Sequence, residues 1–131
     1  MSGTEHDSVE LLSVTPVVPA RDVAAAIAFY VDKLGFTESW RSEPGDAGGV
    51  RRGGVEIHFF QCDDPKIASW TAFRVRCSDV TAWYERCREQ GIVHPNGPLR
   101  NTPWGTSEFT ALDPDRVGLT FWQPLPRPDE R

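Results

Sequence analysis

A strand, a helix and a hairpin follow one another in the same order twice along this chain, and this duplication limits the folds available to it. Helices are expected in "RDVAAAIAFYVDKLGF" and in "SDVTAWYERCREQGI", and a hairpin signal follows each. The helix caps Asp22 and Asp79 are 57 residues apart. The hairpin ends Gln61 and Gln123 are 62 residues apart. Repetition at a nearly constant period predicts two βαβββ modules in one α+β domain.

Both predicted helices have start and stop signals. Asp22 is the expected N-cap of the first helix, and Gly35 directly after it is the expected left-handed C-cap. In the second helix Ser78 or Asp79 is the expected N-cap, and Gly91 is the expected stop. Apolar residues recur at helical spacing in both: Val23, Ala26, Ile27, Tyr30 and Leu34 in the first, and Val80, Trp83, Tyr84 and Cys87 in the second.

The strands are predicted from β-branched runs and turn residues. "LLSVTPVV" is expected to form the first strand, which Pro16 confines to a sheet edge or a strand end and Pro19 terminates. The hairpins are expected to turn at Arg52-Gly53-Gly54 and at Asp113-Pro114-Asp115-Arg116.

Length and composition fit one globular domain. The chain has 131 residues, of which 39% are hydrophobic, including five Trp and seven Phe, and this suffices for a single core. We expect a loosely ordered arm over residues 1–10 and one domain over residues 11–125. Its modules are expected at about 11–62 and 69–125, with a proline-rich tail over 126–131.

Charge and hydropathy disfavour several classes of partner. The formal net charge is −5, whereas the phosphates of nucleic acids require a basic surface, so no nucleic-acid partner is expected. No apolar run approaches the roughly 20 residues that cross a bilayer, and "MSGTEHDSVE" does not resemble a signal peptide. Three cysteines without CxxC spacing predict reduced thiols. We therefore expect a cytoplasmic protein with no membrane partner.

Several segments resemble the glyoxalase/bleomycin resistance protein/dioxygenase superfamily, also called the vicinal oxygen chelate superfamily. They are "ARDVAAAIAFYVDKLGF", "GGVEIHFF", "HPNGPLRNTPWGTSEFTALDPD" and "LTFWQPL", within residues 11–125. The "PWG" motif followed by "EF" and "DPD" is most similar to the bleomycin resistance protein branch. The resemblance implies a curved mixed sheet with an open cleft. It also implies a homodimer with modules exchanged between subunits and two grooves at the interface.

The last turn departs from that branch, which commonly reads Asp-Pro-x-Gly-Asn at this place. Here Asp113-Pro114-Asp115 continues into Arg116 and Val117, so the glycine that eases the turn is missing. We expect a distorted or shifted hairpin in which Gly118 takes the positive-φ position.

The metal ligands of the superfamily's enzymes are largely absent. Those enzymes take His or Glu ligands from inward positions on the first and last strands of each module. The first strand of the second module, "WTAFRVRC", offers Arg74 and Arg76. The last strand of that module, "GLTFWQ", offers no carboxylate or imidazole. Glu56 and His58 remain as weak candidates, but a catalytic zinc usually needs three protein ligands. No metal or other cofactor is expected, although a divalent metal stays open.

No catalytic arrangement is predicted from the sequence. The chain contains no GxSxG elbow, no GxGxxG after a strand, no P-loop and no HExxH. Glu108 and Asp113 are one conceivable carboxylate pair. The favoured interpretation is that Asp113 organises its turn through its side chain and that Glu108 caps or pairs locally.

A polar and aromatic groove is the expected ligand site. Alternation in "VEIHFF" directs Val55, Ile57 and Phe59 toward the helices, which leaves Glu56, His58 and Phe60 on the open face. In the bleomycin resistance proteins an aromatic residue after the first helix and the "PWG" tryptophan border the antibiotic groove. By this resemblance Trp40 and Trp104 are the candidate stacking residues, and Gly105 lets the backbone turn after Trp104.

The remaining arginine and tryptophan candidates bear on the charge of the ligand and on packing. If Arg74 and Arg76 face the same cleft, they favour an anionic ligand over a cationic one. Trp70, Trp83 and Trp122 are assigned to core or dimer contacts.

Three functions follow from these residues. The leading hypothesis is a small-molecule binding protein that sequesters a bleomycin-type glycopeptide antibiotic without catalysis. One alternative is a divalent-metal-dependent lyase, isomerase or dioxygenase of the same superfamily. The other is a carrier or sensor of another small metabolite. Metal analysis separates the first two, and the direction of Arg74 and Arg76 bears on the third.

Overall fold

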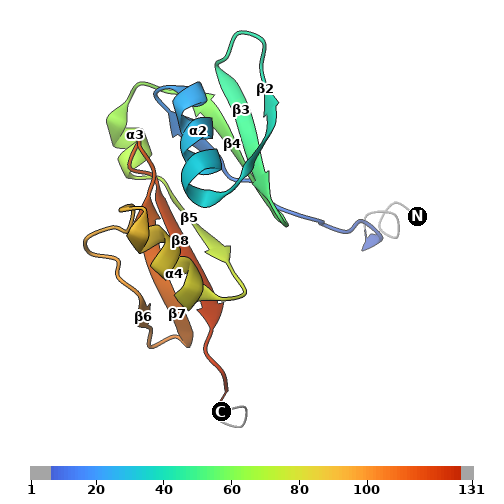
Figure 1. The fold of residues 1–131 in the computed structure, drawn as a ribbon. Coiled ribbons are helices and arrows are strands. Elements are labelled where there is room, and N and C mark those ends of the chain that lie inside the picture. Colours follow the sequence, from blue (N-terminus) through green and yellow to red (C-terminus); the bar gives the residue numbers. More distant parts are fainter. Residues whose placement is uncertain (1–6, 128–131) are drawn as a thin grey trace.

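The computed structural model describes residues 7–127 and contains two four-stranded mixed sheets, each covered on one face by a helix (Figure 1). The first module consists of β1 (Val17–Ala20), α2 (Val23–Leu34), β2 (Thr37–Arg41), β3 (Ala47–Arg52) and β4 (Val55–Gln61). The second consists of β5 (Ala72–Arg76), α4 (Val80–Glu89), β6 (Arg100–Asn101), β7 (Thr106–Leu112) and β8 (Gly118–Pro124). A short helix that was not predicted, α3 (Pro65–Ser69), joins them. The two βαβββ modules are confirmed.

Both sheets have the same topology. Their strand orders are β1-β4-β3-β2 and β5-β8-β7-β6, so the first strand of each module lies beside its last. The β1–β4 and β5–β8 pairs are parallel, and the remaining pairs are antiparallel. Identical orders in the two sheets are what a duplicated unit produces.

The predicted helix caps are confirmed. The Asp22 side chain accepts a hydrogen bond from the backbone N–H of Ala25, and Gly35 ends α2 with φ 70°. The Asp79 side chain accepts from the N–H of Ala82, and Gly91, with φ 72°, follows the end of α4. Each helix is therefore delimited by groups close to it in the sequence.

The apolar faces of the helices and sheets form one continuous core. Tyr30 of α2 is fully buried, and its ring contacts Phe36 and Phe59. In the second module Phe109 and Phe121 pack on each other beneath α4. Every second residue of the strands points into this core, and no helix of residues 7–127 packs on the opposite face of either sheet.

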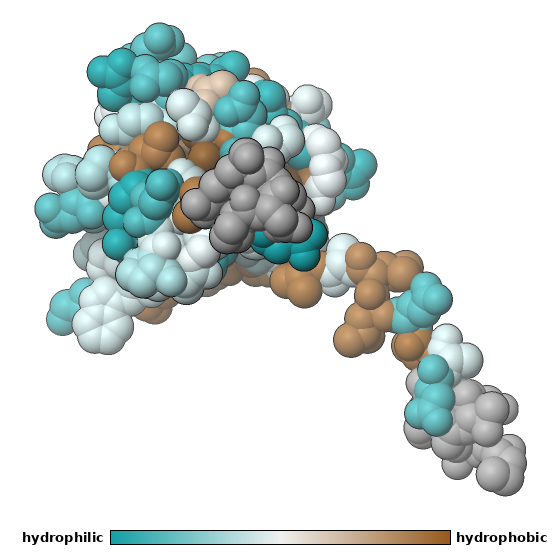
Figure 2. Space-filling view, turned by 90° about the horizontal axis from the view of Figure 1, so that it is seen from below, coloured by the Kyte–Doolittle hydropathy of each residue, from teal (hydrophilic) through white to brown (hydrophobic). Residues whose placement is uncertain are grey.

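The first strand begins later than predicted. The sheet includes Val17–Ala20, whereas Leu11, Leu12 and Val14 lie outside it and are 96%, 85% and 91% exposed. Figure 2 shows this segment as an apolar arm that projects from the body of the molecule. Pro19 does not end the strand, because β1 is an edge strand and tolerates a residue without an N–H. Residues 1–6 and 128–131 of the predicted arm and tail lie outside the described residues.

The second hairpin contradicts the expected distortion. Pairing between β7 and β8 runs without a shift from Thr106 opposite Pro124 to Leu112 opposite Gly118. Arg116, with φ 70°, takes the positive-φ position that was expected at Gly118. The turn keeps its shape because the Asp113 side chain accepts hydrogen bonds from the backbone N–H groups of Asp115 and Val117, as predicted for this aspartate.

Polar contacts join the two modules. The Tyr30 hydroxyl donates to the Asp113 carboxylate at 3.0 Å, and the Arg86 guanidinium donates to the Lys33 carbonyl at 3.3 Å.

The helices between residues 7 and 127 include none with the length and apolar character needed to span a bilayer.

Candidate functional site

Two helix-free sheet faces carry the predicted site residues. The first face is defined by Trp40, Gly49, Glu56, His58 and Phe60, on the sheet of module one. The second face is defined by Arg74, Arg76, Glu108, Thr120 and Trp122, on the sheet of module two. The predicted outward direction of Glu56, His58 and Phe60 is confirmed, because Ile57 and Phe59 between them are buried.

A β-bulge places Trp40 on the first face. Pairing between β2 and β3 shifts from Glu38 opposite Val50 to Trp40 opposite Gly49, so two residues of β2 oppose one of β3. Without this extra residue, strand alternation would direct Trp40 to the same side as Glu38. Ser39, at the bulge, donates its hydroxyl to Glu56 at 3.0 Å.

The Trp40 indole lies over Gly49, against His58. The Trp40 and His58 ring centroids are 5.3 Å apart with an interplanar angle of 80°, an edge-to-face contact. A Cβ on Gly49 would lie 2.5 Å from Trp40 Nε1 and 2.8 Å from His58 Cδ2. Only glycine therefore leaves room for this indole on the strand. Trp40 and Phe60 are each 39% exposed and offer apolar surface to a ligand.

Glu56 is the polar centre of the first face. Its carboxylate accepts from Arg51 at 2.7 Å and lies 2.9 Å from His58 Nε2. These hydrogen bonds, from Arg51 first and then from His58 and Ser39, lower the pKa of Glu56 to about 2. Glu56 is therefore ionised throughout the neutral range, and its charge is balanced by Arg51.

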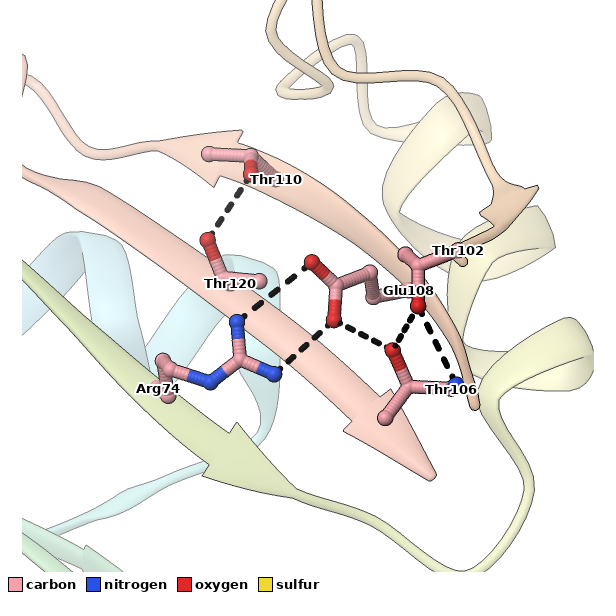
Figure 3. A network of polar contacts seen from close by, with 6 residues as sticks. All are labelled: Arg74, Thr102, Thr106, Glu108, Thr110 and Thr120. Atoms are coloured by element: carbon pink, nitrogen blue, oxygen red, sulfur yellow. Dashed lines mark hydrogen bonds and ion pairs between the residues drawn. The ribbon is translucent and has the colours of Figure 1, made fainter. Parts of the chain in front are cut away.

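An ion pair spans the central strand of the second face (Figure 3). The Arg74 guanidinium on β5 reaches across β8 to the Glu108 carboxylate on β7 through two hydrogen bonds, of 2.8 Å and 3.4 Å. Glu108 is 7% exposed, so its carboxylate depends on this partner. The two-point arrangement matches the planar fork of an arginine. Glu108 is thus paired across the sheet in addition to its local hydrogen bond from Thr106, and the pairing across the sheet was not predicted.

Threonine hydroxyls continue the network in Figure 3 toward β6. Thr106 Oγ1 donates to Glu108 at 2.8 Å and lies 2.8 Å from Thr102 Oγ1. The Arg74 guanidinium above all, and then the Thr106 hydroxyl, lower the pKa of Glu108. On the same face the Thr110 and Thr120 hydroxyls are 2.9 Å apart. Arg74 was predicted as a ligand-binding residue and Glu108 was considered as a carboxylate, whereas the four threonines were not predicted as site residues.

Trp104 stands at the rim of the second face, in the loop between β6 and β7. The residue is 59% exposed, and the Arg100 guanidinium lies 5.3 Å from its ring centroid. A side-chain hydrogen bond from Trp104 also helps to lower the Glu108 pKa. Gly105 has φ 88°, so the tight turn after Trp104 uses the conformational freedom expected of it.

Three tryptophans were assigned to core or dimer contacts, and the core assignment holds for one of them. Trp83 packs against the core. Trp122 lies on the second face, where the guanidiniums of Arg74 and Arg76 lie 5.4 Å and 5.5 Å from its ring centroid. Trp70, the C-cap residue of α3, is 90% exposed.

The described side chains do not fit a metal centre. Within residues 7–127 no three His, Cys, Asp or Glu side chains gather where they could hold a metal ion. Glu56 and His58 are two donors of one strand and bind each other. Two such donors fall short of the three protein ligands usual for a catalytic zinc.

The structure groups the predicted site residues into two sets. Trp40, Glu56, His58 and Phe60 share the first face. Arg74, Trp104 and Gly105 belong to the second module. The sequence contained a usable signal for the missed ion pair, since Arg74 and Glu108 both alternate with core-facing residues. Their proximity depends on the order of β5, β8 and β7, which alternation alone does not predict.

Two repeated βαβββ modules, each with a helix-free sheet face that carries aromatic and charged side chains, are typical of one superfamily of proteins. Residues 12–121 match the Glyoxalase/Bleomycin resistance protein/Dioxygenase superfamily, and the chain belongs to this superfamily.

Within the superfamily the chain is similar to bleomycin resistance proteins. The one from Klebsiella pneumoniae is 33% identical over 119 residues, which cover 83% of this chain and 90% of the relative. The one from Geobacillus stearothermophilus is 28% identical over 132 residues, covering 88% and 98%. The crystal structure of the bleomycin-binding protein from bleomycin-producing Streptomyces verticillus, complexed with copper(II)-bleomycin, superposes with a TM-score of 0.75 at 28% identity. That match covers 91% of this chain and 99% of the other.

Proposed function

We propose that this protein binds a bleomycin-type glycopeptide antibiotic and sequesters it without chemical turnover. The observation that carries the proposal is Trp40, whose indole is held over Gly49 against His58 with 39% of its surface exposed. A pre-positioned aromatic face suits a planar heteroaromatic group, because little side-chain entropy is lost on binding. The similarity to bleomycin resistance proteins and to a bleomycin-bound structure supports the choice of ligand.

In this proposal the antibiotic-binding groove is formed by a homodimer with exchanged modules. The first face of one subunit is completed by the second face of its partner, which brings Trp40 and Trp104 to one ligand. The separate sheets of a single chain support this arrangement, since each has a bare face. The exposed apolar arm at Leu11, Leu12 and Val14 also supports it, because such surface is normally covered by a partner.

Charge in the groove favours a ligand that is near neutral or carries dispersed charge. Glu56 is balanced by Arg51, and Glu108 by Arg74, so neither face presents an uncompensated carboxylate from these pairs. Stacking on Trp40 and Trp104 would then provide most of the affinity. We place the protein in the cytoplasm, which is consistent with the free thiols of Cys62, Cys77 and Cys87.

A tryptophan-fluorescence titration with metal-free and copper(II)-loaded bleomycin tests the proposal. Wild type is expected to be quenched saturably at one ligand per chain, with a Kd below about 1 μM. Trp40→Leu and Trp104→Leu are expected to weaken binding. Trp70→Leu is the matched control, because Trp70 is 90% exposed and lies on neither face.

Two results would overturn the proposal. One is no binding up to about 100 μM, which is far too weak for sequestration. The other is equal loss of affinity in the Trp70 variant and in the two groove variants. The dimer is tested separately by light scattering of the full chain, for which twice the 14.7 kDa subunit mass is expected.

Arg76 favours a second candidate, the binding of an anionic metabolite on the second face. Its guanidinium lies over Trp122, and no carboxylate in the described chain pairs with it. Arg74 on the same face is already neutralised by Glu108. A free guanidinium beside an aromatic ring suits a planar carboxylate. Arg76→Gln is expected to abolish such binding and to weaken bleomycin binding less than Trp40→Leu and Trp104→Leu do.

A further inference from the structure

A cavity of about 520 Å³ lies between the two modules, and Arg76 is the one residue among those that define the two helix-free faces that also lines it. We name it the junction cavity. It is bounded by the turn between β3 and β4, by the end of β5 and by the first turns of α4. Its apolar wall includes Phe36, Val55, Val75 and Phe121. The volume is in the range of small-molecule sites.

Three arginines line this cavity, Arg52, Arg76 and Arg86, and the guanidiniums of Arg52 and Arg86 lie close to each other. Arg52 Nη1 donates to the carbonyl of Leu34, and Arg86 Nε donates to that of Lys33, so both bind the last carbonyls of α2. Arg52 Nη1 and Arg86 Nη2 both lie within contact distance of the position that a Cβ on Gly35 would occupy. Two positive charges are thereby held together at one end of the cavity.

No carboxylate of the described chain forms an ion pair with either guanidinium. Among residues 7–127 that line the cavity, the single acidic side chain is Asp79, which already accepts from the N–H of Ala82. Each arginine uses one nitrogen for the helix carbonyls, so most of its N–H donors have no acceptor within residues 7–127.

Trp83 stands between these charges and the apolar wall. The Arg52 and Arg86 guanidiniums lie 4.9 Å and 5.4 Å from its ring centroid. Its indole nitrogen is buried and has no hydrogen-bond partner in the described part of the chain. A buried N–H without an acceptor is uncommon in proteins. Because no acceptor fixes the ring, a rotation that offers this N–H to a bound oxygen breaks no hydrogen bond.

We propose that the junction cavity binds a small amphipathic anion. Its carboxylate or phosphate group lies on the guanidiniums of Arg52 and Arg86, and its apolar body contacts Phe36, Val75 and Phe121. Guanidinium donors match both kinds of oxyanion. The site is separate from the groove proposed for the antibiotic, since Trp40 and Trp104 do not line it.

The test follows the indole N–H signals of the ¹⁵N-labelled full chain, with Trp83 assigned by Trp83→Phe. The probes are 1-naphthoate, 1-naphthyl phosphate and the neutral 1-naphthol. We expect one or both anions to move the Trp83 signal saturably, and 1-naphthol to leave it unchanged. Binding by only one anion identifies whether a carboxylate or a phosphate is the natural head group.

Two substitutions at Ala82 separate the effect of charge on anion binding from the effect of side-chain size. Position 82 is exposed, lines the cavity and lies one turn before Arg86 on α4. Ala82→Glu therefore places a carboxylate where it pairs with Arg86, without removing any present contact. Ala82→Gln has the same size and no charge, and both residues are favourable at the third helical position after the N-cap Asp79.

Ala82→Glu is expected to weaken anion binding about tenfold or more, since it neutralises one of the two charges, and Ala82→Gln is expected to bind as wild type does. Equal affinities in the two variants would overturn the proposal. So would 1-naphthol binding as tightly as the anions. Shifts confined to Trp40 and Trp104 would place the probe on the helix-free faces and would also overturn it.

Discussion

At the scale of single residues, Gly49 controls the position of Trp40. Any side chain here would overlap the Trp40 indole at Nε1 and the His58 ring at Cδ2. Trp40 is half-exposed and is the easier of the two to displace, so the strand itself would remain intact. The position of the Trp40 indole, and with it the ligand surface of the first face, thus depends on the absence of a Cβ at position 49.

Gly49→Ala is expected to weaken bleomycin binding about 2- to 30-fold, because displacing an aromatic stack costs about 0.5–2 kcal/mol. Tryptophan emission of the free protein should shift to longer wavelength as Trp40 moves toward solvent. Gly54→Ala is the control, since a Cβ there meets nothing within 4 Å. Unchanged affinity and emission in Gly49→Ala would show that Trp40 does not require this glycine.

Glu108 is the residue that holds the second face together. Glu108→Gln leaves the Arg74 guanidinium without its carboxylate and is expected to lower the free energy of unfolding at pH 7 by about 1–2 kcal/mol. Glu38→Gln, which breaks the exposed Glu38–Arg41 pair, should cost about 0.5 kcal/mol or less. Urea unfolding of the three proteins measures both values.

The pH dependence gives a second readout for Glu108. Arg74 lowers its pKa in the folded protein below the ordinary value of 4.5. The stabilisation is therefore complete above pH 4.5 and is lost as the pH falls through the folded pKa. The difference between wild type and Glu108→Gln should shrink below pH 4.5, and a constant difference would contradict the ion pair as its cause.

At the scale of secondary-structure elements, the β7–β8 turn contains a local strain. Arg116 has φ 70°, a conformation that costs a residue with a Cβ about 1 kcal/mol relative to glycine. Hydrogen bonds from Asp115 and Val117 to Asp113 hold the turn in this shape. The hairpin keeps its register because a side chain replaces the missing glycine as the organiser of the turn.

Arg116→Gly is therefore expected to raise the free energy of unfolding by about 1 kcal/mol, less the entropy gained by the unfolded chain. Arg116→Ala is the matched control, because it removes the exposed guanidinium and keeps the Cβ. Thermal unfolding should place the glycine variant above both wild type and the alanine variant. Equal midpoints for the two variants would assign any gain to the lost charge.

At the scale of the whole molecule, the Tyr30–Asp113 hydrogen bond joins α2 of one module to the last hairpin of the other. Both residues are buried, and the bond is 3.0 Å long. Burial raises the pKa of Asp113 from 3.8 to about 6, despite the stabilising hydrogen bonds from Val117, Tyr30 and Asp115. The junction between the modules is consequently sensitive to pH.

The sign of this dependence is the reverse of that for Glu108. The folded protein binds the Asp113 proton more tightly than the unfolded chain, so stability falls as the pH rises from 3.8 to about 6 and is then constant. Relative to Asp113→Asn, wild type should lose up to about 3 kcal/mol between pH 4 and pH 7. Tyr30→Phe should destabilise more at pH 7, where the carboxylate needs its donor, than at pH 4. If neither the stability difference between wild type and Asp113→Asn nor that between wild type and Tyr30→Phe changed with pH, the titration of Asp113 at the junction would be contradicted.

The sequence by itself determined the repeated modules, the two main helices and the direction of the β4 side chains. These features depend on residues close together in the chain: Asp22 and Gly35 at the ends of α2, and alternating residues along β4. Local chemistry of this kind acts in the same way wherever the element is placed.

Only the tertiary structure decided how the site is assembled. The bulge that redirects Trp40 depends on the pairing of β2 with β3, and the Arg74–Glu108 pair depends on β8 lying between β5 and β7. The first strand begins at Val17, where its parallel pairing with β4 starts opposite His58. Register and strand order arise from contacts between residues far apart in the chain, and periodicity along one segment contains no information about them.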